Sequence, residues 1–383
     1  MATSRFRIPF IKGQHPKNTK ENTYKFAATK GDGVITLAEI VGPTAAAEIE
    51  KTNELQFHAL GDSGRGPHTA QQDVAEAMAR DINPTQHQKS PAFLMHLGDV
   101  IYGDGKEDLY DDEFYRPYAD YPNKIIAIPG NHDGEEGVTM DKTSLKAFRD
   151  NFCAAAGTEP PFAKIFNSEM VKQPGVYWML ESKLLNLIGL YSNAAESAGT
   201  LGDQQLGMHQ LNWLEKTLKA VAKERASGIR KGLILAMHHP PYSRGLSTQG
   251  FGHGSSLDML GQMDRASKAA GVWPDAVLSG HSHNYQRYSR NMPLNGKVKT
   301  IPYIVVGTGG FAIQPAPSGI GHSVGDVTYV NGSPPKGLVE QHQPRTGYGY
   351  LTVKVKKKSM EFTFILVQGN HRQPFETLTV PLN

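Results

Sequence analysis

Five short motifs carry most of the residues in this chain that could do chemistry. In order along the chain they are Gly61-Asp62-Ser63-Gly64, Gly98-Asp99-Val100-Ile101-Tyr102, Gly130-Asn131-His132-Asp133, Ala236-Met237-His238 and Gly280-His281-Ser282-His283. Together they supply carboxylates, imidazoles, an amide and a phenol, which are ligand types that hold pairs of metal ions in hydrolases. One motif alone would mean little, because an Asp after a Gly often only caps a helix or closes a turn. Their joint occurrence in this order indicates a metal-dependent hydrolase.

Each motif follows a short apolar run that predicts a buried strand. The five runs are 55–60, 93–97, 124–128, 231–236 and 276–279. Helices are predicted from the spacing of apolar residues at 69–82, 203–225 and 256–270. Strands that alternate with helices predict an α/β fold, and such folds bind ligands at the carboxyl ends of their strands. All five motifs are predicted to stand at such an end.

After residue 284 the pattern is mostly that of β-structure. Three strands are predicted there: 301–306, 348–356 and 360–367. Residues 307–346, rich in Gly, Pro and His, are predicted to form one long loop. Because no change in composition separates 54–285 from the rest, we predict a single catalytic domain over 54–383. Residues 1–53 are predicted to be an N-terminal extension, whose role the sequence leaves open.

The composition excludes several classes of protein. The 383 residues are 39% hydrophobic and 20% charged, as is usual for globular domains. The formal net charge of +3 is too small to predict a nucleic-acid or membrane surface. No run approaches the roughly 18 apolar residues that a membrane span needs. Cys153 is the single cysteine, which excludes an intrachain disulfide framework.

The N-terminal segment gives an expectation for the compartment. The opening residues lack the continuous apolar core of a signal peptide. The expected compartment is therefore the cytosol, or the periplasm or cell exterior if the natural chain begins earlier.

The five motifs resemble those of the calcineurin-like metallophosphoesterases, and within that superfamily those of the purple acid phosphatases. The family pattern is GDxG, GDxxY, GNH(D/E), a VxxH-like strand end and GHxH. The chain departs from it only at Leu235, where the pattern has Val, and the resemblance covers roughly residues 55–310. It implies an α/β sandwich of two mixed β-sheets flanked by helices.

Two positions decide the subfamily. Most metallophosphoesterases carry a ligand His two residues after the first Asp, where this chain has Gly64. The purple acid phosphatases also lack that His and have a Tyr three residues after the second Asp, which corresponds to Tyr102. A chance Tyr would not explain the missing His, so the two features together favour this subfamily.

The resemblance implies two metal sites that share one carboxylate. The first site consists of Asp62, Asp99, Tyr102 and His283, and the second of Asp99, Asn131, His238 and His281, with Asp99 as the bridge. The first set offers hard, anionic oxygens, which suit a trivalent ion such as Fe(III). The second offers neutral imidazoles and an amide, which suit divalent Fe, Zn or Mn. The two ions would activate a hydroxide as the nucleophile.

Two histidines are candidates for catalysis. His132 follows the ligand Asn131, where it could stabilise or protonate the leaving oxygen. His253, in the loop Gly252-His253-Gly254, resembles a substrate-binding His of the family.

We predict an acid phosphatase that hydrolyses phosphate monoesters, with a small phosphorylated substrate, inorganic phosphate as product, and no nucleic-acid or membrane partner. A phosphodiesterase acting on cyclic nucleotides or other diesters is the first alternative, because a pair of metal ions serves both reactions. A non-catalytic phosphate- or metal-binding protein that kept the fold is the second. The sequence leaves the natural substrate and the oligomeric state open, since specificity would lie in the loops at 103–120, 240–256 and 307–346.

Overall fold

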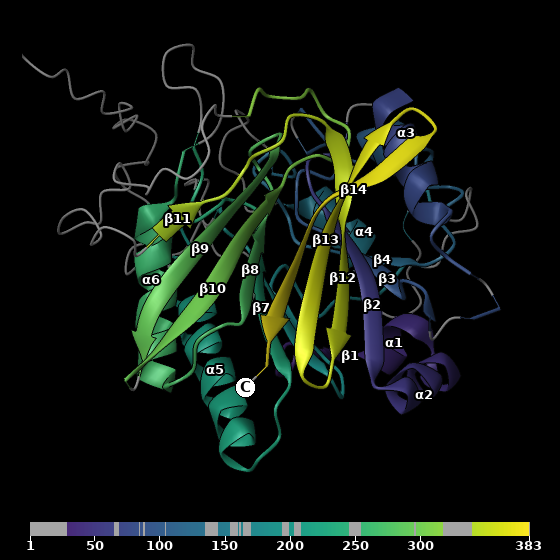
Figure 1. Ribbon diagram of the computed structural model, residues 1–383. Helices are drawn as coiled ribbons and strands as arrows, with labels where there is room; N and C mark the ends of the chain where they lie inside the picture. Colours follow the sequence, from purple (N-terminus) through teal and green to yellow (C-terminus); the bar gives the residue numbers. More distant parts are fainter. Residues whose placement is uncertain are drawn as a thin grey trace, which may run out of the picture.

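Two β-sheets packed face to face form the centre of the computed structural model, and helices cover their outer faces (Figure 1). The structure describes residues 29–64, 69–83, 85–86, 89–103, 105–134, 145–153, 160, 162–163, 170–193, 199–202, 208–244, 254–294, 296–316 and 339–382. Each sheet contains both parallel and antiparallel pairs of strands. The predicted α/β sandwich of two mixed sheets flanked by helices is confirmed.

The larger sheet has eight strands. In spatial order they are β1 (Val34–Thr36), β5 (Trp178–Glu181), β6 (Leu185–Leu190), β7 (Gly232–Met237), β8 (Ala276–Ser279), β10 (Lys297–Val306), β9 (Tyr285–Leu294) and β11 (Val339–Gln341). The central strands β6, β7, β8 and β10 run parallel. β9 pairs antiparallel with both β10 and β11.

The smaller sheet has six strands. In spatial order they are β14 (His371–Pro381), β13 (Ser359–Gln368), β12 (Tyr348–Lys356), β2 (Glu54–Leu60), β3 (Phe93–His96) and β4 (Lys124–Ala127). β2, β3 and β4 run parallel, and β12 joins them to an antiparallel hairpin pair. The sheet therefore has a parallel half, which carries three of the motifs, and an antiparallel half.

The helices lie outside the two sheets. They are α1 (Leu37–Val41), α2 (Pro43–Thr52), α3 (Thr69–Ala79), α4 (Lys146–Phe152), α5 (His209–Ala226) and α6 (Leu257–Ala270), with a π-helical turn η2 at Asp111–Tyr115. α5 and α6 cover the outer face of the larger sheet (Figure 1). Within the described residues, no helix is both long enough and apolar enough to cross a membrane.

The strand β7 shows how the core forms. Ile234 and Ala236 face the smaller sheet and belong to the core between the sheets. Leu233, Leu235 and Met237 point to the other side and pack against α5 and α6. A strand buried on both faces reads as a continuous apolar run, which is the pattern that predicted this strand. The strands predicted before all five motifs are confirmed to within one residue at each end.

Other predictions of secondary structure need correction or addition. Residues 307–346 do not form one uninterrupted loop, because 339–341 are β11, which pairs with β9. Three residues are too few to show a strand pattern in a sequence. Of the predicted extension 1–53, residues 34–52 contribute β1, α1 and α2, and β1 pairs with β5.

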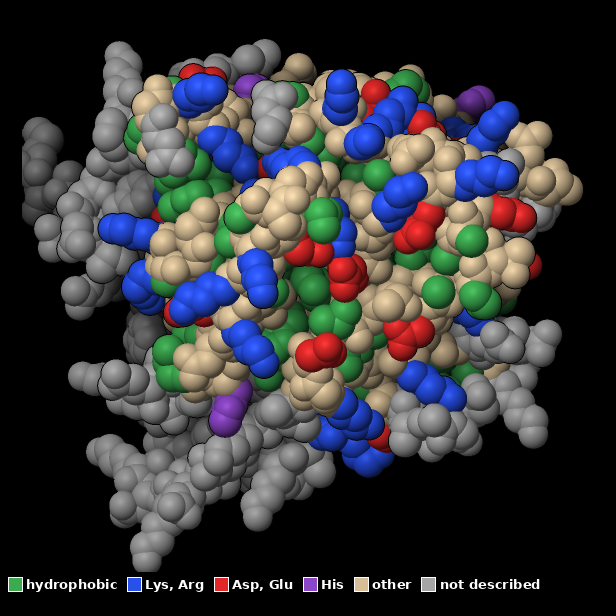
Figure 2. Space-filling view, turned by 90° about the horizontal axis from the view of Figure 1, so that it is seen from below, with side chains coloured by type: hydrophobic (Ala, Val, Ile, Leu, Met, Phe, Trp, Pro, Cys, Tyr) green, Lys and Arg blue, Asp and Glu red, His purple; other side chains and the backbone are tan. Residues whose placement is uncertain are grey.

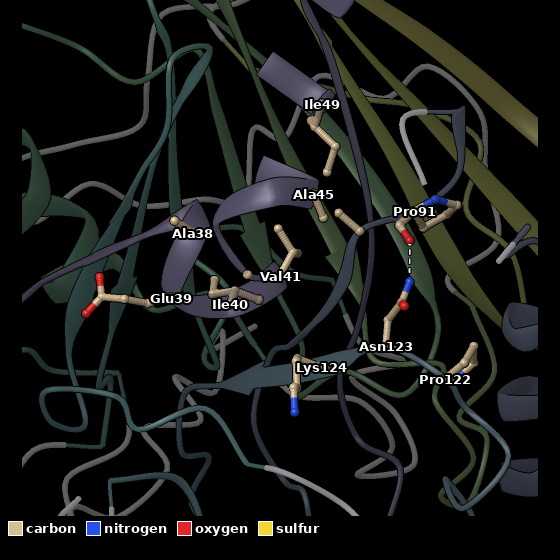
Figure 3. Close-up of a pocket in the computed structure, with 12 residues that line it drawn as sticks. Ala38, Glu39, Ile40, Val41, Ala45, Ile49, Pro91, Pro122, Asn123 and Lys124 are labelled. Carbon is tan, nitrogen blue, oxygen red and sulfur yellow. Dashed lines mark hydrogen bonds between the residues drawn. The ribbon is translucent and has the colours of Figure 1, made fainter. Parts of the chain in front are cut away.

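The amino ends of the motif strands lie at the face shown in Figure 2, where Lys and Arg side chains are interspersed with Asp and Glu. Here a groove of about 480 Å³ is lined by α1 and α2, by Pro91 and Ala92 before β3, and by Pro122, Asn123 and Lys124 at the start of β4 (Figure 3). The Asn123 amide donates a hydrogen bond of 2.6 Å to the Pro91 carbonyl oxygen across its wall. The groove and the five motifs therefore belong to opposite ends of the strands.

Candidate metal centre

The carboxyl ends of five strands bring the five motifs to one edge of the sandwich. β2, β3 and β4 end there in one sheet, and β7 and β8 end there in the other. Backbone hydrogen bonds join the two sheets at this edge. The Gly61 N–H donates to the Val306 carbonyl over 2.9 Å, and the Gly309 N–H donates to the Gly61 carbonyl over 2.9 Å. The motif loops are therefore held against one another by the backbone.

Three predicted ligands have left-handed backbone conformations. The φ angle is 61° at Asp62, 51° at Asp99 and 67° at His281. Each residue stands two or three positions after the end of its strand, where the chain turns. Positive φ is costly for residues other than Gly, and such residues persist where the surroundings fix them, often at functional sites.

Asp62, Tyr102 and His283 form a first group of side chains. The Tyr102 hydroxyl lies 3.2 Å from Asp62 Oδ1 and 3.2 Å from His283 Nε2. His283 Nε2 lies 3.3 Å from Asp62 Oδ1. Ligand atoms that bind one ion at about 2.0–2.2 Å lie about 3 Å from one another, so this triangle fits a single metal ion.

Asp99, Asn131, His238 and His281 form a second group, which surrounds His238 Nε2. This nitrogen lies 3.2 Å from Asn131 Oδ1 and 3.3 Å from Asp99 Oδ2. It also lies 3.2 Å from His281 Nδ1. The ligand atoms of Asp99, His238 and His281 all lie within 4.8 Å of one another. This group also fits one metal ion.

Backbone carbonyls fix the outer nitrogens of two of these imidazoles. His238 Nδ1 lies 2.9 Å from the Leu97 carbonyl oxygen, and His283 Nδ1 lies 2.8 Å from that of Ala312. A carbonyl oxygen only accepts, so each Nδ1 carries a proton and the Nε2 atom of each ring faces its group. Metal-binding histidines are usually oriented by such contacts. In their neutral forms these rings therefore point lone pairs into both groups, where a cation would satisfy them.

The charges in the two groups shift the pKa values of their neighbours. Burial lowers the pKa of His238, but the carboxylates of Asp99 and Asp62 outweigh burial and raise it to about 9. Burial, followed by the charges of Asp62 and Asp99, raises the pKa of Tyr102 well above 10. In the protein alone the imidazole thus carries the positive charge, and the phenol needs a stronger cation before it ionises.

A buried carboxylate that the sequence reasoning missed holds two motif loops. Asp133 Oδ1 accepts hydrogen bonds from the Val100 and Ile101 N–H groups over 3.0 and 3.2 Å. Asp133 Oδ2 accepts one from the Gly130 N–H over 2.7 Å. Burial, and then the charge of Asp99, raises the pKa of Asp133 to about 7. Its place at the end of the third motif was a signal, but the contact across to the second motif was not visible in the sequence.

Glu113 holds the backbone of Tyr102. The Tyr102 N–H donates to Glu113 Oε2 over 2.6 Å, and Glu113 belongs to the π-helical turn η2. The Gln71 amide in turn donates to the Glu113 carbonyl over 2.7 Å. Single π-turns are frequent at functional sites. No sequence pattern predicted this contact, because an acidic run such as 111–113 is typical of a solvated helix start.

Two motif glycines provide space that a side chain would fill. A Cβ at Gly130 would lie 2.1 Å from Asp99 Oδ1, so Gly permits the close approach of that carboxylate. A Cβ at Gly64 would lie 2.3 Å from the Val100 carbonyl oxygen and 2.6 Å from the Ile101 Cα atom. A His at position 64 therefore does not fit without a shift of the backbone.

The segment that carries these groups matches a known family. The sequence model of the calcineurin-like phosphoesterases matches residues 55–285, from the second residue of β2 to the first of β9. The chain belongs to this family. The match includes all five motifs, and the family is that of the metallophosphoesterases.

Two relatives of this phosphoesterase are acid phosphatases, and each shares a low sequence identity with it. This chain is 26% identical over 273 residues to tartrate-resistant acid phosphatase type 5 of Homo sapiens. The match covers 68% of this chain and 74% of the relative. The same phosphatase from Oryctolagus cuniculus is 26% identical over 334 residues, or 83% and 89% of the two chains.

Solved structures share its fold. The structure described as GAP50, the anchor in the inner membrane complex of Plasmodium, has a TM-score of 0.55 at 15% identity and covers 86% of this chain and 89% of that one. PhoD has a TM-score of 0.54 at 12% identity and covers 86% and 70% of the two chains. At these identities the likeness concerns the fold alone.

The structure brings together all seven side chains that were predicted as ligands in this phosphoesterase, and their roles as ligands stay a prediction. The bridging role of Asp99 also stays a prediction. Its carboxylate lies in the second group, and its charge contributes to the raised pKa of Tyr102 in the first.

Of the two histidines predicted to act in catalysis, the structure describes His132. The His132 N–H donates to Asp99 Oδ1 over 2.9 Å, and its ring centroid lies 4.6 Å from that of Tyr102. The imidazole is thus next to both groups without belonging to either. His253 lies outside the described residues.

Proposed function

We propose that this phosphoesterase is an acid phosphatase of the purple type, which hydrolyses phosphate monoesters with Fe(III) at the first group and divalent Fe, Zn or Mn at the second. The observation that carries the proposal is the position of the Tyr102 phenol, 3.2 Å from both Asp62 Oδ1 and His283 Nε2. Most metallophosphoesterases have a ligand His at the position of Gly64, where this backbone leaves no space for one.

The donor atoms of the first group favour a trivalent ion. A free phenol has a pKa near 10, and burial and the nearby carboxylates raise that of Tyr102 further. Ionising it therefore requires strong local positive charge, which a trivalent ion supplies better than a divalent one. The second group contains one carboxylate, one amide and two imidazoles, which is a donor set that suits a divalent ion.

The charge balance of the two groups favours a phosphate ester as substrate. Three side chains would be anionic with both ions bound: Asp62, Asp99 and Tyr102. Against the five positive charges of the ions they leave the pocket positive, which attracts a phosphate dianion. When bound, the two ions would supply Lewis-acid activation of water and neutralise charge that develops on the phosphate.

His132 is assigned to the leaving group. The hydrogen bond from its N–H to Asp99 Oδ1 fixes the start of the side chain beside both groups. Its ring is only half-buried, so it can face an entering substrate. In this position it would protonate the leaving oxygen or stabilise negative charge on it. His253 remains a proposed substrate-binding residue.

The proposed substrate is a small phosphorylated molecule, and the proposed product is inorganic phosphate; neither a nucleic-acid nor a membrane partner is proposed. The similarity to two acid phosphatases, each 26% identical to this chain, favours a phosphate monoester over a diester as the substrate.

A paired assay tests the proposal. Iron-loaded protein is given an aryl phosphate monoester and a diester with the same leaving group, and the metal content is measured on the same sample. We expect two ions per chain and faster turnover of the monoester. Faster turnover of the diester would make the protein a phosphodiesterase instead. No turnover of either ester with two ions bound would indicate a non-catalytic binding protein.

A further inference from the structure

A phenylalanine from outside the five motifs stacks on the Tyr102 ring. Phe311 lies five residues after the end of β10, and its ring centroid is 3.4 Å from that of Tyr102 with an angle of 3° between the rings. Tyr102 is 6% exposed, and the Phe311 ring lies directly against one of its faces. The same Phe311 ring lies edge-on to His283, with the centroids 5.1 Å apart and an angle of 84°. One side chain thus contacts two of the three members of the first group.

The backbone imposes this stack. Two aromatic rings left to themselves prefer an offset or an edge-to-face arrangement over full face-to-face overlap. Here the Phe311 N–H donates to the Asp62 carbonyl over 3.0 Å, which fixes the residue at the end of β2. The preceding Gly310 has φ of 147°, and a Cβ on it would lie 2.6 Å from the Gln71 Cα atom. The segment therefore has little freedom to carry the Phe311 ring elsewhere.

The residue after Phe311 acts on the same group. The Ala312 carbonyl accepts the hydrogen bond from His283 Nδ1 over 2.8 Å. The segment after β10 therefore orients His283 through a carbonyl and Tyr102 through a ring.

We propose that Phe311 is a positioning residue for the Tyr102 ligand. By stacking on the phenol it fixes the plane of the ring, and with it the direction in which the lone pairs of the hydroxyl oxygen point in the space between Asp62 Oδ1 and His283 Nε2. The plane of the ring in turn sets the orientation at which the oxygen would meet the metal. The part of this inference that concerns the metal rests on the proposed Fe(III) site, whereas the restraint on the ring does not.

The restraint is tested first in the metal-free full-length protein. Tyrosine rings are labelled with ¹³C, and the Tyr102 signal is assigned by its loss in Tyr102→Phe. Because the ring must leave the stack to rotate, Phe311→Leu should speed its rotation about two- to tenfold, the range given by the free energy of an aromatic pair. Phe311→Tyr keeps an aromatic ring and should keep the slow rate. Equal rates in wild type and Phe311→Leu would overturn the inference.

A matched control separates the stack from a general loss of packing. Phe93 stacks on Phe57 in the core, with ring centroids 5.0 Å apart and an angle of 8°. Phe93→Leu should leave the rotation of Tyr102 at the wild-type rate. Thermal unfolding is measured for every variant, and Phe311→Met replaces Phe311→Leu if the latter does not fold.

The iron-loaded protein tests the consequence for the metal. The charge-transfer band of a phenolate bound to Fe(III) depends on the orientation of the ring, so Phe311→Leu should shift its maximum while keeping its intensity per iron. A faster ring with an unshifted band would overturn the positioning role. If wild type lacks the band altogether, the Fe(III) proposal fails, and the rotation rates alone decide whether Phe311 positions Tyr102.

Discussion

Buried carboxylates stand at both ends of the motif strands, but their partners differ. Asp275, directly before β8, is at the amino ends and is 1% exposed. It forms ion pairs with three cations, Arg225, Arg230 and Lys299, over 2.8, 2.8 and 2.7 Å. The face at this end carries many Lys and Arg side chains (Figure 2). The protein thus compensates this charge with its own cations.

Asp62 and Asp99 at the carboxyl ends are as deeply buried, at 0% and 1% exposed. Among the described residues, neither forms an ion pair with a Lys or Arg. Their ion-pair partners are the Nε2 atoms of His283 and His238, each at 3.3 Å. In the protein alone burial lowers the pKa values of both imidazoles, but these carboxylates outweigh burial and raise them, so protonated histidines offset the charges. A bound metal ion would take over this role, with both rings as neutral ligands. The two ends therefore differ in the way expected if Asp275 is a structural carboxylate and Asp62 and Asp99 belong to the proposed metal site.

The largest effect is expected from Asp99→Ala. The variant removes the proposed bridge of the first site and the only carboxylate of the second group. We expect loss of both ions and of nearly all turnover, measured by metal analysis and an aryl phosphate assay.

Asp275→Asn is the matched control, because it removes a buried carboxylate at the other end. It should retain both ions and the turnover of the folded protein. Two ions at full occupancy in Asp99→Ala would refute the bridge, and loss of the ions in both variants would erase the contrast between the two ends.

The next largest effect is expected from His132→Ala. Loss of a general acid typically costs on the order of 10²–10⁴ in rate, so kcat should fall by that factor with normal metal content. The loss should be greater with an alkyl phosphate, whose leaving group needs the proton more. His371→Ala, an exposed His at the start of β14, is the control. Unchanged rates with both esters would remove His132 from the mechanism.

Tyr102→Phe should have a more selective effect. Iron-loaded wild type is expected to be purple or pink, and the variant should lose this colour and retain the trivalent ion less well. The second group keeps all its ligands, so the divalent ion should stay. Absorption spectra and the content of each metal measure the two effects. A colourless wild type, or a variant that keeps the band, would make this an ordinary divalent-metal phosphoesterase.

Gly64→His in the Tyr102→Phe background sharpens this test. It restores the ligand type that most metallophosphoesterases have at this position. Because a Cβ there would lie 2.3 Å from the Val100 carbonyl oxygen, we expect no recovery of the trivalent ion. Recovery would show that the backbone can move and that a His at this position can replace the Tyr102 phenol as a ligand.

The positions of the predicted ligands could be read from the sequence because they follow strands that are buried on both faces. The run at β7 and the His238 after it illustrate this, since apolar length alone identifies the strand and its end. β9 had no such signal. Its Arg287 and Arg290 are buried because they pair with Glu376 and Asp264, which are far away in the sequence. A polar strand of this kind is recognised only when its partners are known.

The supporting contacts of the site were unpredictable for the same reason. Three residues from outside the second motif contact it: Asp133, Glu113 and Phe311. Their residue types are also common in roles without any function. The ligands could thus be predicted from local patterns, whereas the residues that hold them depend on the folded chain.

The smallest effect is expected on stability, at the amino ends. Removing one partner of a buried ion pair costs about 3–5 kcal/mol. The cations around Asp275 are 19–27% exposed on their side chains, and solvent relieves part of their repulsion. We therefore expect Asp275→Asn to lower the free energy of unfolding by about 3 kcal/mol at neutral pH, measured by urea denaturation.

The contribution of Asp275 should also depend on pH in a defined direction. Burial raises its pKa, but the three cations outweigh burial and lower it. A lowered pKa means that the charged carboxylate stabilises the folded state above its unfolded pKa near 3.9, and that this stability is lost as the pH falls through the lower folded value. The difference between wild type and Asp275→Asn should be constant near neutral pH and shrink below about pH 4. A difference that grows on acidification would mean that the three cations do not stabilise the charged form of Asp275.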